Sequence, residues 1–377
     1  MAQRQSAHDA IPPSSPGEPA LKWVGADQPP MRPDVVQVQA KRDEFALLLG
    51  TRDAADAARA RLERRIALGP VLAKQLAAAL AEVVRIHEAR TGSLDAMPVG
   101  RPGGAYSDAD VPPGARPLFE RVRALETGFG FEKSFKLARK SLREDRVILG
   151  VRSALATPEA LLGACRDIGM PQPYLDAFAR ELGGANTVGF GYEGDGHGGV
   201  YKVYLEFWEK LRERVLRDPA NREPALLFLG FKWEAGEGGR AALARYTCHP
   251  LLSVRGILAR LEALYEARSE SPSLGAARAI LALAVRRIGG DDSFVYVEAG
   301  EEGNPRKSFD LNFYKAGLRV RDLLPALSAL CREYSIAAAE LERVETQAGG
   351  RAFGHLSGGL GRDGQDFLTV YYELEAL

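Results

Sequence analysis

The chain has 377 residues, 46% apolar and 27% charged, which is typical of a soluble globular protein with ample material for a core. Fifty lysines and arginines balance fifty aspartates and glutamates, so the net charge argues against a nucleic-acid-binding protein, and any electrostatic role must be local. The sequence has three widely spaced cysteines, Cys165, Cys248 and Cys331, which predict free thiols. It shows no signal-peptide core and no run of eighteen apolar residues, so we expect a cytoplasmic protein without membrane contact.

The first predicted element is a disordered tail over residues 1–33, which are rich in Pro, Ser and Gly. VVQVQAKRDEFALLLG then alternates on both sides of a charged turn, and PVLAKQLAAALAEVVRIHEARTG follows with helical spacing. We expect a small ββα domain over residues 34–94, which resembles a small bacterial domain of unknown function. Its Ala-rich helix is typical of surfaces that pack against another chain, so this domain is expected to bind a protein partner or to self-associate.

Residues 95–117 predict a linker, because Pro and Gly interrupt every periodic pattern there. Residues 118–377 then predict a barrel-forming domain in which hairpins alternate with helices, the helices following Thr157 and Ser253 and covering residues 274–288 and 320–334. Tight turns make the neighbouring strands antiparallel, which gives an α+β fold and excludes a Rossmann fold. The five strand pairs are FEKSFKLAR with DRVILGVR, NTVGFGYEG with GVYKVYLEF, ALLFLGFKWEA with AALARYTCH, SFVYVEAG with RKSFDLNFYKA, and RAFGHLSGG with GQDFLTVYYE.

The predicted strands share a division into one aliphatic face and one face of tyrosine and charge. In VYKVYLEFW, Lys202, Tyr204 and Glu206 alternate with Val, Leu and Phe. A sheet covered by helices on one face and open to water on the other would explain this without any function. Because tyrosines recur on the polar face, we favour a closed ten-stranded antiparallel barrel with a ligand-sized lumen and helices outside.

Five αββα repeats of this kind resemble the ABBA aromatic prenyltransferases over residues 118–374. GFGYEGDGHGGVYKVYLE is similar to the family hairpin that ends in a Lys-x-Tyr strand, which implies that Lys202 holds a diphosphate and Tyr204 shields an allylic cation. FLTVYYE is similar to a later tyrosine-bearing strand and implies the same for Tyr371. The family's Arg-x-Lys-x-Tyr strand here reads FDLNFY, so Asp310 and Asn312 replace two cations, which leaves open another polar ligand or another enzyme on the same barrel.

Prenylation by an allylic cation needs cations around the leaving diphosphate, π-faces around the carbocation and a base for the acceptor's proton. The expected substrates are a prenyl diphosphate and an aromatic small molecule, without nucleic acid; no cofactor is assigned, and a requirement for magnesium stays open. The candidates are Lys202, Lys232, Arg245 and, more weakly, Arg152 for the diphosphate; Tyr204, Tyr296, Tyr314 and Tyr371 for the carbocation; Asp310 and Asn312 for polar contacts; and Glu206, Glu298 and Glu373 for the base.

The alternative function is non-catalytic binding of a small molecule or partner, with residues 34–94 as a docking module.

Other motifs predict little chemistry. GYEGDGHGG lies between two strands, so we interpret it as a hairpin turn and not as a phosphate loop. His355 and Ser357 alternate on one strand without an aspartate at a fixed offset, so the sequence does not indicate a catalytic triad.

Overall fold

The computed structural model describes residues 33, 35–40, 44–52, 59–77, 79–80, 110–194, 199–218, 221–234, 239–266, 270–288 and 294–373. The chain divides into two compact units, Met1–Val84 and Arg85–Leu377. The predicted tail up to residue 32 and the linker up to residue 109 lie outside the described residues. The last predicted linker residues form the 3-10 helix η2 (Pro113–Ala115) and the start of helix α2 (Arg116–Arg123). No helix among the described residues is long and apolar enough to cross a membrane.

The first unit contains a three-stranded antiparallel sheet in the order β1 (Val35–Ala40), β2 (Phe45–Arg52) and β3 (Ala60–Leu68), with helical residues from position 70. The two predicted strands and helical residues after them are present, and the structure adds a third strand, β3, that the sequence did not predict. Strand β3 reads ARLERRIAL, and a bulge at Glu63, near its centre, interrupts the pairing. The charged ERR stretch breaks the apolar alternation that would have identified this strand from sequence.

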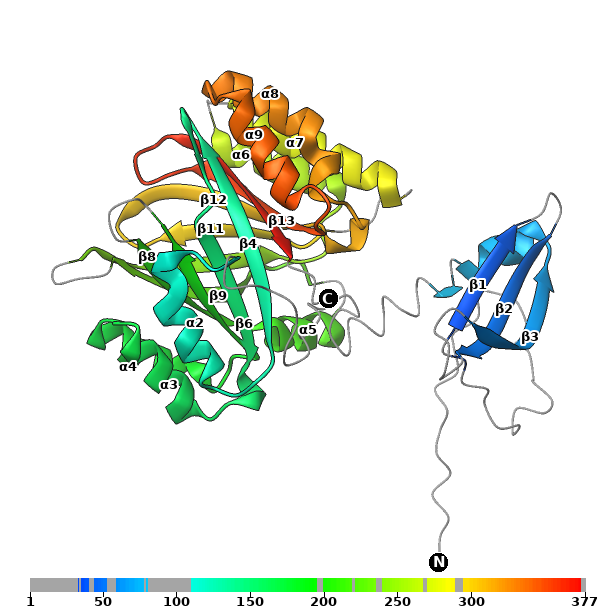
Figure 1. Cartoon of the computed structure of the whole chain (residues 1–377), viewed down its shortest axis with the longest axis horizontal. Helices are drawn as coiled ribbons and strands as arrows, with labels where there is room; N and C mark the ends of the chain where they lie inside the picture. The colour runs from blue at the N-terminus through cyan, green and yellow to red at the C-terminus, as the bar shows by residue number, and fades with distance from the viewer. Residues whose placement is uncertain are drawn as a thin grey trace, which may run out of the picture. The chain divides into compact units, whose positions relative to one another are not determined.

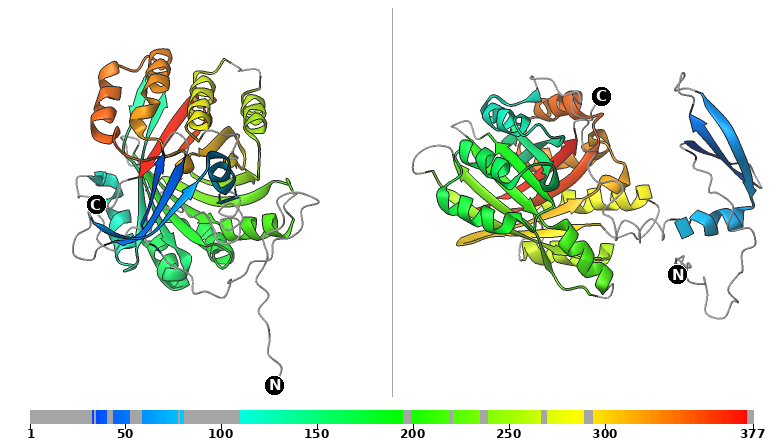
Figure 2. Two further views of the ribbon diagram at one scale, coloured as in Figure 1. Left: turned by 90° about the vertical axis from the view of Figure 1, so that its right-hand side faces the viewer. Right: turned by 90° about the horizontal axis from the view of Figure 1, so that it is seen from below.

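The second unit is a closed antiparallel barrel of ten long strands (Figures 1 and 2). All five predicted hairpins are confirmed, and β14 closes the barrel by pairing with β4, so that Tyr371 lies opposite Ser134. A short strand, β5 (Ser141–Arg143), adds to β4. The ten strands are β4 (Phe129–Ala138), β6 (Arg146–Arg152), β7 (Thr187–Glu193), β8 (Val200–Glu206), β9 (Ala225–Glu234), β10 (Ala241–His249), β11 (Tyr296–Glu301), β12 (Asn304–Asn312), β13 (Phe353–Leu360) and β14 (Asp366–Glu373).

Helices cover the outside of the barrel in two groups, α2 to α4 on one side and α6 to α9 on the other (Figure 1). The predicted N-caps are confirmed, since the side chains of Thr157 and Ser253 each accept a backbone hydrogen bond of 3.2 Å. The remaining helices are α3 (Pro158–Asp167), α4 (Gln172–Leu182), α5 (Trp208–Arg217), α6 (Val254–Tyr265), α7 (Pro272–Ile288), α8 (Leu324–Tyr334, after the 3-10 helix η5, Val320–Leu323) and α9 (Ala338–Ala348).

Strand β8 has the orientation that the sequence predicted. Val203 and Leu205 are fully buried in the outer core, together with Phe207 just after the strand. Since alternate residues of a strand point to opposite faces, Lys202, Tyr204 and Glu206 face the lumen. The barrel core is therefore the helix-covered layer, and the polar alternate positions are left to form the interior.

The seam that closes the barrel offers a test of this packing. Leu368 on β14 is fully buried opposite the equally buried Leu137 on β4. Replacing Leu368 by Ala should lower the free energy of unfolding by about 2–5 kcal/mol, because it removes packed methyl groups and leaves a cavity. The exposed Leu155 supplies the control, for which Leu155→Ala should stay within about 0.5 kcal/mol. Urea unfolding followed by tryptophan fluorescence measures both, and equal losses would contradict the closed seam.

Candidate active site

The strand register places a large set of polar side chains in the lumen. Residues directly opposite each other on neighbouring strands point to the same face, so Lys202 shares its side with Gly191 on β7 and Lys232 on β9. Following the ladder around the barrel assigns the same face on every strand. The charged and tyrosine side chains so placed are Glu132, Lys136, Arg146, Glu193, Lys202, Tyr204, Glu206, Lys232, Tyr246, Glu301, Arg306, Asp310, His355 and Tyr371.

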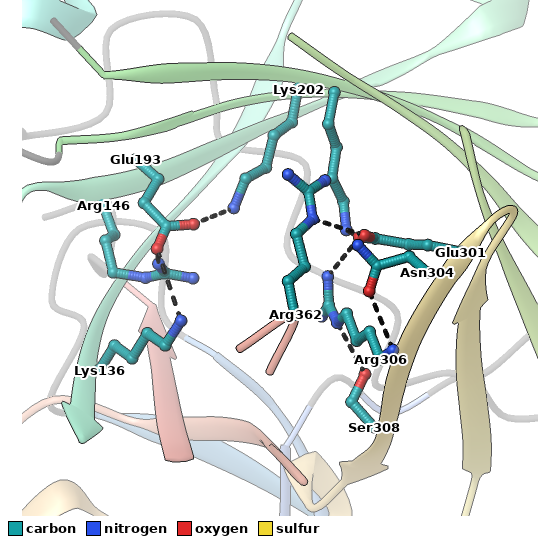
Figure 3. Close-up of polar contacts among 10 residues, drawn as sticks. Lys136, Arg146, Glu193, Lys202, Glu301, Asn304, Arg306, Ser308 and Arg362 are labelled. Carbon is teal, nitrogen blue, oxygen red and sulfur yellow. Dashed lines mark hydrogen bonds and ion pairs between the residues drawn. The ribbon is translucent and has the colours of Figure 1, made fainter. Parts of the chain in front are cut away.

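At the end where the hairpin turns lie, cations gather around two carboxylates, as Figure 3 shows. Glu193 accepts contacts from one group of cations and Glu301 from another. Among the described residues the cations outnumber the carboxylates by six to two, so this end of the lumen has an excess of positive charge. We call this set the cation cluster; its members are Lys136, Arg146, Lys202, Lys232, Arg306 and Arg362 with Glu193 and Glu301.

The contacts in the cation cluster are close and buried. Lys232 lies 2.6 Å from Glu301, and Arg306 and Arg362 each approach Glu301 to 2.7 Å. The carboxylate of Glu301 is fully buried. Although burial disfavours its ionised form, the cations hold the pKa of Glu301 far below its ordinary value. The same balance lowers the pKa of Glu193, which Arg146 and Lys202 contact.

The three lysines of the cation cluster have lowered pKa values. Burial lowers the pKa of Lys202 and of Lys232 to about 7, and that of Lys136 to about 8. Neighbouring arginines add to the effect, because like charges disfavour the protonated lysine. An incoming anion would relieve both penalties. The cluster is therefore arranged as an anion site of high charge density.

Next along the lumen comes a layer of aromatic rings, Tyr204, Tyr246 and Tyr371. The rings of Tyr204 and Tyr246 meet edge to face with centroids 5.8 Å apart. The two rings can approach residue 230 because it is a glycine. A Cβ atom at Gly230 would lie 3.0 Å from the Tyr204 ring and 3.1 Å from the Tyr246 ring. Burial raises the pKa of all three tyrosines, so their hydroxyls stay protonated and their rings neutral.

Beyond the tyrosines, at the end where helices connect the hairpins, acidic groups surround one histidine. His355 stacks on the Tyr371 ring at 3.9 Å, and its Nδ1 lies 2.7 Å from Asp310. Its Nε2 lies 3.4 Å from Glu132, which also accepts a hydrogen bond from the Tyr314 hydroxyl. Although burial disfavours the imidazolium, Asp310 and Glu132 raise the pKa of His355 well above its ordinary value. We call Glu132, Glu206, Asp310 and His355 the acid cluster.

Glu206 differs from the other carboxylates of the acid cluster. Its carboxyl makes no hydrogen bond or ion pair with any residue that the structure describes. Burial, reinforced by the negative charge of Glu132, raises the pKa of Glu206 to about 7. Burial also works against ionisation of Glu132, but His355 holds the pKa of Glu132 below its ordinary value. The two carboxyls therefore differ in protonation near neutral pH.

An apolar wall lies on the other side of this end. Leu211 of α5 packs with Leu227, Cys248 and Val297, and the lumen residues Phe228 and Tyr246 extend the cluster. Val297 lies directly opposite Asp310 on β12, so apolar and acidic positions adjoin in the same ladder. Apolar and polar side chains therefore meet at this end of the lumen, a combination that suits an aromatic molecule.

Most of the sequence-predicted site residues meet in this lumen. Lys202 and Lys232 belong to the cation cluster, and Tyr204 and Tyr371 to the tyrosine layer. Glu206 and Asp310 belong to the acid cluster, and Asn312 shares the lumen side of β12. Tyr314 lies just beyond β12, in the 3-10 helix η4 (Tyr314–Ala316), and reaches Glu132.

Other predicted residues lie elsewhere. Arg245 points outward with more than half of its side chain exposed, 3.7 Å from Glu302. Tyr296 and Glu298 also face outward, where Glu298 binds Arg260 of α6 at 2.8 Å. The prediction placed the polar side of every strand in the lumen. On β10 and β11 this was wrong, because the lumen side there is mainly Ala, Val and Cys and the polar side faces outward. Arg152 shares the lumen side of β6 but is exposed at the end of that strand, and the side chain of Glu373 lies outside the described residues.

Several site residues were not predicted. Arg306 is in phase with Asp310 in RKSFDLN, and Glu132 and Lys136 are in phase in FEKSFKLAR, so strand alternation could have identified them. His355 was noticed, but its aspartate partner is on another strand. Arg362 comes from the β13–β14 turn, where no periodicity exists to mark it. Within the described part of the chain, no group of three or more His, Cys, Asp or Glu side chains is arranged to hold a metal ion.

Comparison with known proteins finds similar solved structures but no matching family model and no matching curated protein. One similar structure is 6-dimethylallyltryptophan synthase from Micromonospora olivasterospora in complex with DMASPP and Trp, at 16% identity and a TM-score of 0.42 over 65% of this chain and 81% of that chain. Others are the NotF prenyltransferase (13%, 0.41, 67% and 82%) and AnaPT from Neosartorya fischeri (13%, 0.39, 66% and 79%). The ten-stranded αββα barrel of this chain is established by its own strand pairing.

Proposed function

We propose that this chain is an aromatic prenyltransferase that moves a prenyl group from an allylic diphosphate to an aromatic acceptor inside the lumen. One observation carries the proposal: cation cluster, tyrosine layer and acid cluster follow one another along the barrel, in the order of Lys202, Tyr204 and Glu206 along β8. This is the order in which a leaving diphosphate, a carbocation and a proton-losing acceptor would lie. Each layer is placed by the same strand alternation.

The diphosphate of the donor would sit in the cation cluster. Lys202, Lys232 and Arg306 can each give it a charge-assisted hydrogen bond, and the buried setting strengthens such contacts. The cations missing from FDLNFY are supplied from elsewhere, since Arg306 precedes that segment on β12 and Arg362 enters from a turn. Asp310 has a different partner, His355.

In the reaction, the bond between the allylic carbon and the diphosphate oxygen breaks, and the electron pair leaves with the diphosphate. The rings of Tyr204, Tyr246 and Tyr371 present π-faces to the resulting carbocation and shield it from water. The aromatic acceptor, lying against the apolar wall, supplies the electron pair for the new bond. The displaced ring proton must then be removed.

Glu206 is the group that we assign to this proton. A general base works best when its pKa lies near the operating pH, and burial beside Glu132 raises the pKa of Glu206 to about 7. Its carboxyl has no partner among the described residues that would have to be displaced. Asp310 and Glu132 are already bound to His355.

Removing Lys202 tests the donor site. Lys202→Ala should weaken the binding of inorganic pyrophosphate by on the order of 1–3 kcal/mol, because one buried charge-assisted contact is lost. Arg245→Ala removes an equal charge from the outer face and is the matched control, expected to leave affinity unchanged. Isothermal titration calorimetry measures both, and equal effects of the two variants would place the anion site outside the lumen.

The lowered pKa values of the lysines predict a pH dependence. Lysine is charged below its pKa, so Lys202 and Lys232, with a pKa of about 7, lose their charge as the pH rises above 7. Pyrophosphate affinity should then fall by up to about tenfold per pH unit for each lysine that must regain a proton on binding. Lys202→Arg keeps its charge and should show a shallower decline in calorimetry between about pH 6 and pH 9, roughly the range in which the lysines titrate. Identical slopes for wild type and variant would contradict this assignment.

Replacing Glu206 tests the chemistry. Glu206→Gln should lower kcat by roughly 10²–10⁴-fold with dimethylallyl or geranyl diphosphate and a responsive indole or phenol, because the base is lost. It should also remove the rise of kcat with pH near the pKa of Glu206. The exposed Glu302 gives the control variant Glu302→Gln. If wild type binds pyrophosphate in the lumen but adds mass to no acceptor, the non-catalytic binding function replaces the transferase.

A further inference from the structure

The first unit leaves its apolar side chains uncovered, in contrast to the barrel. Among the described residues, seven of the eight large exposed hydrophobic side chains belong to it: Val36, Val38, Leu62, Ile66, Val71, Leu72 and Leu80. Val36 and Val38 are 61% and 60% exposed. Exposed apolar groups gathered on one small unit mark an interaction surface.

Three of the exposed side chains of the sheet, Val36, Val38 and Ile66, lie on one face, whereas Leu62 lies opposite Gly50 on the other. Val38 is opposite Leu47, which is opposite Ile66, so the three form a stripe across β1, β2 and β3. Val36 pairs with Leu49 on the same face. The buried Ala46 points to the other face. The apolar stripe therefore reaches the outer edge of β1.

The two edges of the sheet differ in charge. Strand β1 reads VVQVQA and pairs with β2 along its whole length without a bulge, so its edge is uncharged and regular. Strand β3 carries Arg61, Glu63, Arg64 and Arg65 and contains a bulge. Charges and bulges protect a sheet edge from pairing with another strand. Among the described residues, β1 is the edge without such protection.

We propose that β1 pairs antiparallel with β1 of a second copy of this chain, joining two three-stranded sheets into one of six strands. The charge distribution favours a copy of itself: β1 has no charge to attract a charged partner, and two β1 strands bring no like charges together, whereas two β3 strands would set arginine against arginine. A two-fold interface of this kind is self-complementary and closed.

The pairing also joins the apolar stripes. In the proposed register, Val36 of one copy faces Val38 of the other and Gln37 lies on the two-fold axis, which keeps the valines of both copies on one face. The four valines then form one continuous surface with the stripes of both sheets. This association does not depend on the proposed transferase activity.

Sedimentation of the full-length chain over a range of concentrations tests the proposal. Wild type should reach twice the mass of one chain, and Val36→Lys with Val38→Lys should remain at the mass of one chain. Gln37→Lys, on the opposite face, places two like charges on the two-fold axis and should also abolish the dimer without altering the apolar stripe. Leu155→Lys, which changes the exposed apolar residue outside this unit, is the control and should leave the dimer intact.

Hydrogen exchange separates loss of pairing from loss of folding. Amides of the central strand β2 should stay protected in all variants, while those of β1 should lose protection only in the variants that are monomeric. A wild type that stays monomeric at every concentration overturns the proposal. So does a dimer that persists in the two β1 variants, and so does a monomer with protected β1 amides, which would mean that another segment or another protein covers the edge.

Discussion

The lumen depends on one constraint, the two-residue alternation of strands in a hydrogen-bonded ladder that closes on itself. Once β14 pairs with β4, the side of every residue in the barrel follows from that of any other. The aliphatic alternate residues are buried under helices, which leaves the polar ones no place but the interior. Packing of the outer layer thus stabilises an arrangement of buried charge that would not form by itself.

That arrangement carries an electrostatic cost. Burial lowers the pKa of the three lysines, and the excess of cations over the two carboxylates adds to this effect. At the other end burial raises the pKa of Glu206, and the negative charge of Glu132 adds to this effect. Positive potential at one end and negative potential at the other create a field along the barrel, directed so as to move a cation away from the hairpin turns and towards the helix-connected end.

The hairpins could be predicted because their signals are local: glycine-rich turns between alternating runs need no knowledge of distant residues. The faces of β10 and β11 could not, since Ala244, Val297 and Ala299 line the lumen there and only the closed ladder shows it. The pairing of His355 with Asp310 joins residues 45 positions apart. Arg362 reaches Glu301 from a turn, a contact that depends on the conformation of that turn. The local sequence pattern therefore suffices to predict the barrel architecture and the lumen residues of β8. The other site residues can be placed only once the pairing of distant strands is known.

Gly230 shows how a position without a side chain can control the shape of this interior. Both tyrosine rings approach it so closely that a single methyl group there would meet them at 3.0 and 3.1 Å. Any larger residue would displace Tyr204 and Tyr246 together, and Lys232, 5.7 Å from the Tyr246 ring, adjoins the same rings. The space beside the two tyrosine rings and the position of Lys232 are consequently coupled through one backbone site. If the chain has the proposed function, a residue larger than glycine at this point would alter donor size and anion binding together.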